Sequence, residues 1–80
     1  MSVRRQIDRV AAVLSDVVRS GGKDGRAHLK SHGHHGATIR SAVDRGCLRE
    51  LVDGRYEITD DGNAFLIWHR LLPKAIKKQT

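Results

Sequence analysis

The sequence predicts a mainly α-helical chain with one small β-hairpin, in the order helix, helix, helix, hairpin, helix. Three observations favour this class. Apolar residues recur every three or four positions in residues 2–20, two short strand-like runs flank Asp53-Gly54, and residues 64–72 are the most apolar segment. Because 80 residues bury only a modest core, we expect a single domain over residues 1–80, with a basic tail at 73–80.

The first helix is predicted over residues 2–20, with Ser2 as its N-cap and Gly21-Gly22 after its end. Its apolar residues follow the spacing of one buried stripe: Val3, Ile7, Val10, Leu14, Val17 and Val18. The glycine content of residues 21–25 predicts a loop between the first helix and the second.

A short second helix is predicted from about Gly25 to His32, and Asp24 is its expected cap. Residues 33–36 are predicted to be a turn. A third helix over residues 37–45 ends at Gly46, because glycine suits the left-handed residue that follows a helix. Its apolar residues share one face: Ile39, Ala42 and Val43.

The hairpin is predicted from residues 48–52 and 55–59, because Asp-Gly between two strand-like runs favours a tight turn. Tyr56 and Ile58 alternate with charged residues, which indicates that one face of the second strand is buried. Cys47, just before the first strand, is interpreted as a small buried apolar residue rather than a redox thiol.

The last helix is predicted to begin at Thr59 or Asp60 and to end or kink at Pro73. It is apolar on too many sides to be covered by one small core. An uncovered apolar surface usually marks a partner, and we therefore expect a homodimer. The residues expected to serve the core and the dimer surface are Phe65, Trp68, Leu71 and Leu72.

The chain is strongly basic, with 15 Lys and Arg against 9 Asp and Glu and a formal net charge of +6. A small basic domain points first to nucleic acid and second to an anionic membrane. The alternative is that the charge only keeps the protein soluble. The Lys-rich tail holds three lysines, which give only a weak membrane anchor, so we expect no membrane partner.

Several classes are disfavoured by what the sequence lacks. A single cysteine excludes an internal disulfide, and no apolar run approaches the ~20 residues that span a bilayer. The N-terminus has no apolar region typical of a signal peptide, so we expect the cytoplasm, close to the nucleoid. Without a Gly-rich phosphate loop or a nucleophile elbow, we expect neither an enzyme nor a cofactor.

The middle of the chain has the spacing of a helix-turn-helix: Leu29, then Gly33 in the turn, then Ile39. The segment Arg45-Gly46-Cys47-Leu48, followed by Tyr56, Ile58, Thr59 and Gly62, resembles winged-helix DNA-binding domains of the MarR- and PadR-like type. The resemblance covers residues 5–72. It implies that the third helix reads DNA and that the hairpin forms the wing.

The resemblance also implies a role for each matching residue. The expected base-reading residues on the third helix are Thr38, Arg40, Ser41, Asp44 and Arg45, because Arg, Ser and Thr contact base edges. Asp44 would repel phosphate unless it accepts from cytosine or orients Arg40 or Arg45. The expected contacts of the backbone and the wing are Lys30, His34, His35, Arg49 and Arg55. The expected function is sequence-specific binding of double-stranded DNA by a transcriptional regulator, such as a repressor.

The histidines offer a different interpretation. His28 and His32 are four residues apart, so a helix places them on one side, as a pair of metal ligands requires. His34, His35 and Cys47 are further donors. The alternative, which we favour, is that these side chains line a basic surface, so no metal is expected.

Two other functions use the same fold. The domain is alternatively a protein-interaction module that docks by its last helix onto transcription machinery or another regulator. It is alternatively an RNA-binding winged helix, although aromatic residues for base stacking make up only 4% of the chain.

Overall fold

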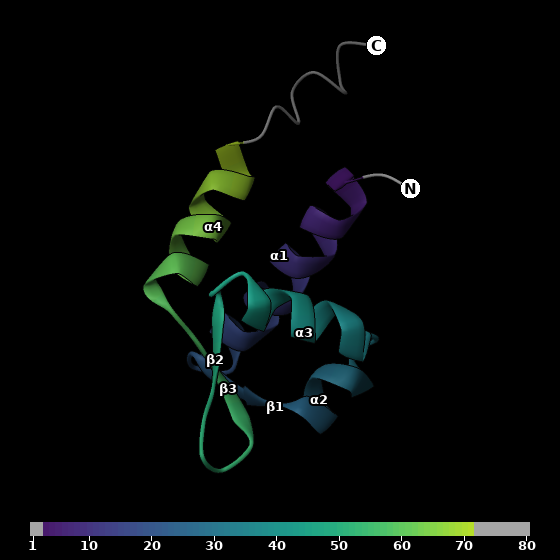
Figure 1. Cartoon of the computed structure of the whole chain (residues 1–80), viewed down its shortest axis with the longest axis vertical. Coiled ribbons are helices and arrows are strands. Elements are labelled where there is room, and N and C mark those ends of the chain that lie inside the picture. Colours follow the sequence, from purple (N-terminus) through teal and green to yellow (C-terminus); the bar gives the residue numbers. More distant parts are fainter. Residues whose placement is uncertain (1–2, 72–80) are drawn as a thin grey trace.

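The computed structural model describes residues 3–71, which are mainly helical and carry a three-stranded antiparallel sheet (Figure 1). This confirms the prediction of a mainly α-helical chain with a small hairpin. The elements are, in chain order, α1 (Val3–Arg19), β1 (Lys23–Gly25), α2 (Arg26–Ser31), α3 (Gly36–Asp44), β2 (Leu48–Glu50), β3 (Arg55–Ile58) and α4 (Asp60–Leu71).

The expected loop at 21–25 is wrong in its second half, because residues Lys23–Gly25 form β1. This strand pairs antiparallel with β3, with Lys23 opposite Glu57, so the sheet order is β1-β3-β2. Three residues are too few to show the alternation by which a strand is recognised in a sequence. A partner more than 30 positions away supplies the hydrogen bonds that make this segment a strand.

Asp24 does not cap α2. The N-cap is Gly25, without a side-chain cap bond, and Asp24 lies one position earlier with only 7% of its surface exposed. Its carboxylate accepts from Ser20 Oγ at 3.1 Å, from the Gly25 N–H at 2.8 Å and from His28 Nδ1 at 2.7 Å. Burial raises the pKa of Asp24, but these bonds outweigh it, and the pKa lies below its ordinary value.

The hairpin loop is one residue longer than the Asp-Gly pair predicts. The Leu51 N–H donates to the Arg55 carbonyl at 2.7 Å, and the Gly54 N–H donates to the Leu51 carbonyl at 2.9 Å. Gly54 has φ +86°, the left-handed residue of a three-residue loop that follows a tight turn. Val52 therefore belongs to the loop rather than to the strand, and its side chain is fully exposed.

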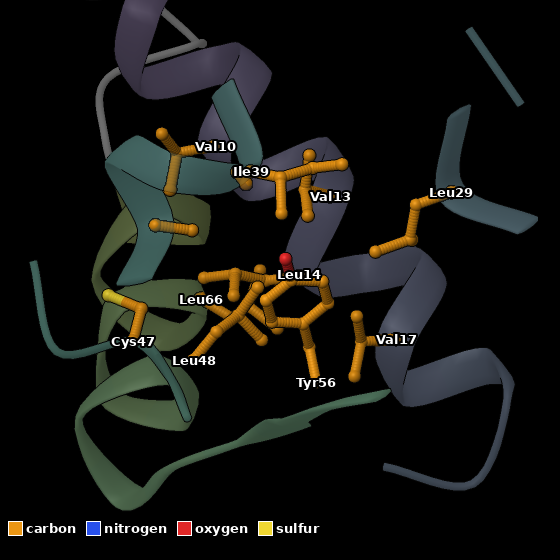
Figure 2. Close-up of a cluster of buried hydrophobic side chains, with 12 residues drawn as sticks. Val10, Val13, Leu14, Val17, Leu29, Ile39, Cys47, Leu48, Tyr56 and Leu66 are labelled. Carbon is orange, nitrogen blue, oxygen red and sulfur yellow. The ribbon is translucent and has the colours of Figure 1, made fainter. Parts of the chain in front are cut away.

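The core forms around α1 (Figure 2). Val10, Val13, Leu14 and Val17 are at most 1% exposed, whereas Val18 is 46% exposed. Val18 was predicted to be on the buried stripe, but it lies about 100° around the helix from Val17. Side chains from the other elements point into the same interior: Leu29 from α2, Ile39 from α3, Cys47, Leu48 and Tyr56 around the sheet, and Leu66 from α4. Ala42 on α3 belongs to the same buried cluster.

The start of α4 is held against the segment that precedes β2. Thr59 caps α4, because its Oγ1 accepts the Gly62 N–H at 3.0 Å, and the same hydroxyl donates to the Gly46 carbonyl at 2.5 Å. Gly62 is buried there. A Cβ on Gly62 would lie 2.7 Å from Ile58 Cγ1 and closer still to the Cys47 carbonyl oxygen. This close approach explains why a glycine occupies the first turn of a helix.

Helices α1 and α4 lie side by side and extend away from the sheet, whereas the hairpin loop projects at the opposite end (Figure 1). A hydrogen bond of 2.7 Å between His69 Nε2 and Asp8 Oδ1 joins the two helices. The predictions for Ser2, Leu72, Pro73 and the basic tail at 73–80 lie outside the described residues.

We expect the substitution Gly62→Ala to lower the free energy of unfolding by about 1–3 kcal/mol, the range for an overpacked site. On helix propensity alone the same change would stabilise the protein by about 1 kcal/mol, so the sign separates the two effects. Urea denaturation followed by circular dichroism measures the difference. The control is Asn63→Ala at the next, exposed position, which should change stability by no more than about 0.5 kcal/mol.

Candidate functional site

The unit formed by α2, a turn and α3 matches the spacing predicted for it. Leu29 and Ile39 are both buried, and Gly33 between them has φ +89°. The turn is closed by backbone bonds, since the Gly33 N–H donates to the Lys30 carbonyl at 3.0 Å and the His34 N–H to the Leu29 carbonyl at 3.3 Å. The core therefore fixes one side of α3 and leaves the other side on the surface.

The outer face of α3 carries most of the predicted base-reading residues. Arg40, Asp44 and Arg45 are exposed, and Ser41 is half-buried beside them. Thr38 lies at the edge of this face, half-buried and next to α1, where it lines a small cavity with Gln6, Arg9, Val10, Ala37 and Ser41. The structure thus leaves Arg40, Asp44 and Arg45 exposed on one face, with Ser41 half-buried at its edge and Thr38 further to its side.

Each arginine on this face has a partner on the same helix. Arg40 Nε lies 3.3 Å from Asp44 Oδ1, and Arg45 Nε donates to Ser41 Oγ at 3.4 Å. Asp44 is thus paired with Arg40. Exposed pairs of this kind contribute only about 0–1 kcal/mol, so the guanidinium groups can exchange these partners for an external acceptor at little cost.

Two cations predicted to contact the DNA backbone lie on the hairpin. Arg49 on β2 pairs with Glu57 on β3, and Arg55 Nε lies 2.9 Å from Asp53 Oδ2 in the loop. Hydrogen bonds from the Arg55 backbone N–H and from its side chain hold the pKa of Asp53 below its ordinary value. Both arginines remain exposed. Lys30 on α2 is also exposed and has no ion pair within residues 3–71.

His34 and His35 occupy different environments. His35 is exposed and is the N-cap of α3, without a side-chain cap bond. His34 turns toward α1: its Nε2 donates to Asp16 Oδ2 at 2.5 Å, and only 13% of its side chain is exposed. His32 Nδ1 lies 3.3 Å from the same oxygen. His34 thus ties the turn to α1 instead of facing outward with the cations.

The two candidate metal ligands lie close together, but each faces a carboxylate. The ring centres of His28 and His32 are 4.3 Å apart. His28 Nδ1 contacts the carboxylate of Asp24, and His32 Nδ1 contacts that of Asp16. Over the described range 3–71, no three His, Cys, Asp or Glu side chains come together as a metal ion requires. Cys47 is buried and burial raises the pKa of its thiol, which disfavours the thiolate.

Sequence reasoning missed Arg26 and Gly36. Both line a cavity of about 400 Å³ between α2, α3 and the hairpin, together with Arg40, Val43, Glu50 and Tyr56. Arg26 begins a six-residue helix that carries little apolar pattern, and Gly36 was interpreted only as a turn residue. No local signal in the sequence could have shown that these two residues meet.

The outward face of α4 is apolar. Ile67, Trp68 and Leu71 are 59%, 45% and 78% exposed, and their spacing places them on one side of the helix. Phe65 is half-buried and packs edge to face against Trp68 with ring centres 5.4 Å apart. The larger part of this apolar surface is therefore not covered by the chain's own core.

Comparisons with known proteins do not assign this site. No protein family, curated protein or solved structure matches the chain. Within residues 3–71, the helices are too short or too polar for any of them to cross a membrane.

We expect Asp16→Asn to destabilise the protein at pH 7 by about 1.5–3 kcal/mol, the range for hydrogen bonds to charged groups. The hydrogen bond from His34 is the largest cause that lowers the pKa of Asp16, with burial opposing it and His32 adding to it. A lowered folded pKa stabilises the protein above the unfolded value of about 3.9, and this stability is lost as pH falls through the folded value.

Urea unfolding at several pH values between about 2 and 7 tests this linkage. The wild type should lose more stability on acidification than Asp16→Asn does. The matched control is Asp44→Asn, which removes an exposed carboxylate on α3 and should cost no more than about 0.5 kcal/mol. Equal acid dependence of the wild type and Asp16→Asn would contradict the assigned role.

Proposed function

We propose that this chain is a winged-helix domain that binds double-stranded DNA sequence-specifically and regulates transcription. The observation that carries the proposal is the outer face of α3, where Arg40, Asp44 and Arg45 lie exposed, with Ser41 half-buried beside them, on a helix fixed by α2 and the turn. In this arrangement α3 is the recognition helix, and β2 and β3 are the wing.

The chemistry of this face suits the major groove. The groove admits an α-helix, and a guanidinium group can donate to both acceptors of guanine. Arg40 is held only by the exposed Asp44 and Arg45 only by a long hydrogen bond to Ser41, so both are available for such contacts. Asp44, when Arg40 leaves it, can accept from the amino group of cytosine.

The hairpin supplies cations at a second position. Its loop projects away from the body of the molecule (Figure 1), with Arg55 exposed at the loop and Arg49 on the neighbouring strand. From there the wing reaches a backbone phosphate or the minor groove next to the major groove that α3 occupies. The formal net charge of +6 over the whole chain favours association with a polyanion.

Selection from a random duplex library at ~0.15 M salt, followed by the affinity of the winning duplex at several salt concentrations, tests the function. We expect one enriched motif. Arg40→Ala and Arg45→Ala should each relax discrimination at one base pair by about 1–3 kcal/mol. Lys30→Ala and Arg55→Ala should instead weaken binding to all duplexes alike. They should also lower the salt slope, the slope of log affinity against log salt concentration, by about one. Weak binding without an enriched motif would contradict the proposal.

We also propose that the domain forms a homodimer through α4. Ile67, Trp68 and Leu71 are exposed apolar residues on one side of α4, and in a two-fold dimer a second copy of the same face would cover them. A two-fold dimer would present two recognition helices to half-sites about one DNA turn apart.

Analytical ultracentrifugation tests the dimer. The wild type should sediment as a dimer, and Leu71→Glu should shift it to a monomer because a carboxylate is buried in an apolar contact. Val52→Glu is the matched control, since it makes the same kind of change at an exposed apolar residue in the hairpin loop. A monomeric wild type, or equal effects of the two substitutions, would overturn this assignment.

The same apolar face favours one alternative, a domain that docks by α4 onto transcription machinery or another regulator. The two proposals differ in what they require of α3. A docking module keeps its function when Arg40 and Arg45 are replaced and loses it with Leu71→Glu, whereas a DNA reader loses its specificity with the arginines.

A further inference from the structure

We propose that Arg26 and Lys30 form a phosphate-binding site over Gly36, which holds one backbone phosphate of the duplex. This inference rests on the proposed DNA-binding function and adds to it the residues and the place of one contact. Neither Arg26 nor Gly36 is among the residues that the sequence assigns to DNA.

The two cations converge on one point of α3. From the position that a Cβ of Gly36 would occupy, Arg26 Nη2 lies 3.0 Å away, Lys30 Cε 3.6 Å and Lys30 Nζ 3.9 Å. Arg26 and Lys30 are four residues apart on α2, so one side of the helix directs both toward the start of α3. A guanidinium and an ammonium group therefore face the same small volume from the same side.

This pair of cations lacks a counterion in the described part of the chain. Neither Arg26 nor Lys30 forms an ion pair or a side-chain hydrogen bond within residues 3–71. Like charges at this spacing on a helix destabilise it. Most of the other cations around α3 and the hairpin, namely Arg40, Arg49 and Arg55, are paired with a carboxylate. An oxyanion between Arg26 and Lys30 would remove the repulsion and gain hydrogen bonds from both groups.

The surroundings define which anion fits. Arg26 and Gly36 line one side of the cavity of about 400 Å³, whereas Glu50 and Tyr56 line its sheet side. The Glu50 carboxylate repels an anion, so the phosphate lies at the α2 side of the cavity. Because the cavity is bounded by α3 and by the hairpin strands, a phosphate held there belongs to the DNA strand that passes from the recognition helix to the wing.

Gly36 keeps the volume between the cations open. Its backbone does not have the positive φ that requires glycine, so an added methyl group is not strained by the backbone itself. That methyl group would meet only the flexible ends of Arg26 and Lys30. Gly36→Ala therefore fills the phosphate site without a change of charge and is expected to leave the fold intact.

The experiment combines two measurements on the full chain. Backbone amide NMR follows a titration with inorganic phosphate, with chloride at matched ionic strength as the reference. Fluorescence anisotropy then measures the affinity for the selected duplex at several salt concentrations. The variants are Arg26→Gln, Lys30→Gln and Gly36→Ala, and the control is Arg70→Gln, which removes an exposed cation from α4.

We expect phosphate, but not chloride, to shift the amide NMR signal of Gly36 in the wild type and in Arg70→Gln. In Arg26→Gln, phosphate should leave the amide signal of Gly36 unchanged. Duplex affinity should fall about tenfold in Arg26→Gln and in Gly36→Ala, the lower end for a charged hydrogen bond. The salt slope should fall by about one in Arg26→Gln and in Lys30→Gln, because each removes a cation at the phosphate.

Two other results separate this inference from the proposed function. If the wild type and all variants bind the duplex equally and phosphate leaves Gly36 unchanged, the site is wrong while DNA binding stands. In the second result, phosphate shifts the amide NMR signal of Gly36 only when Arg26 is present, but no duplex binds. The site then takes a free phosphate-bearing ligand, and both the assignment of its phosphate to DNA and the DNA-binding function are overturned.

Discussion

Burial of the apolar stripe of α1 is the constraint on which the other elements depend. Within residues 3–71, none of the remaining helices exceeds 12 residues and the strands have three or four, lengths at which helices and isolated hairpins are marginal in water. Helices α2, α3 and α4 and strand β3 are stabilised by covering part of the same stripe, through Leu29, Ile39, Leu66 and Tyr56. The position of α3 is therefore set by its inner face, and its outer face is free to carry polar and charged groups.

The contrast between a fixed interior and a free outer surface also holds for the polar contacts of this small domain. The buried carboxylate of Asp24 and the half-buried Asp16 take fixed partners, and they join α1 to β1, α2 and the turn. The arginines of α3 and the hairpin take exposed partners, which are weak and easily exchanged. Strong polar contacts hold the scaffold, whereas weak ones lie where a polyanion would approach.

Sequence reasoning succeeded where a local pattern reports on local structure. The turn at Gly33, the end of α3 at Gly46 and the hairpin at Asp53-Gly54 were each found from glycine and its neighbours. It failed where a residue's environment is built by distant segments. The pairing of Lys23 with Glu57 spans more than 30 positions, and the contact of His34 with Asp16 crosses from the turn to the first helix.

By itself the sequence determined the class of fold, the exposed arginines of α3, and the surplus of apolar side chains on α4, because helical periodicity and glycine positions are local properties. Only the tertiary structure decided that residues 23–25 form a strand and that Gly62 must lack a side chain beneath the Cys47 carbonyl. It alone brought Arg26 and Lys30 together over Gly36. Those features depend on distances between segments, which are fixed only when α1 is buried.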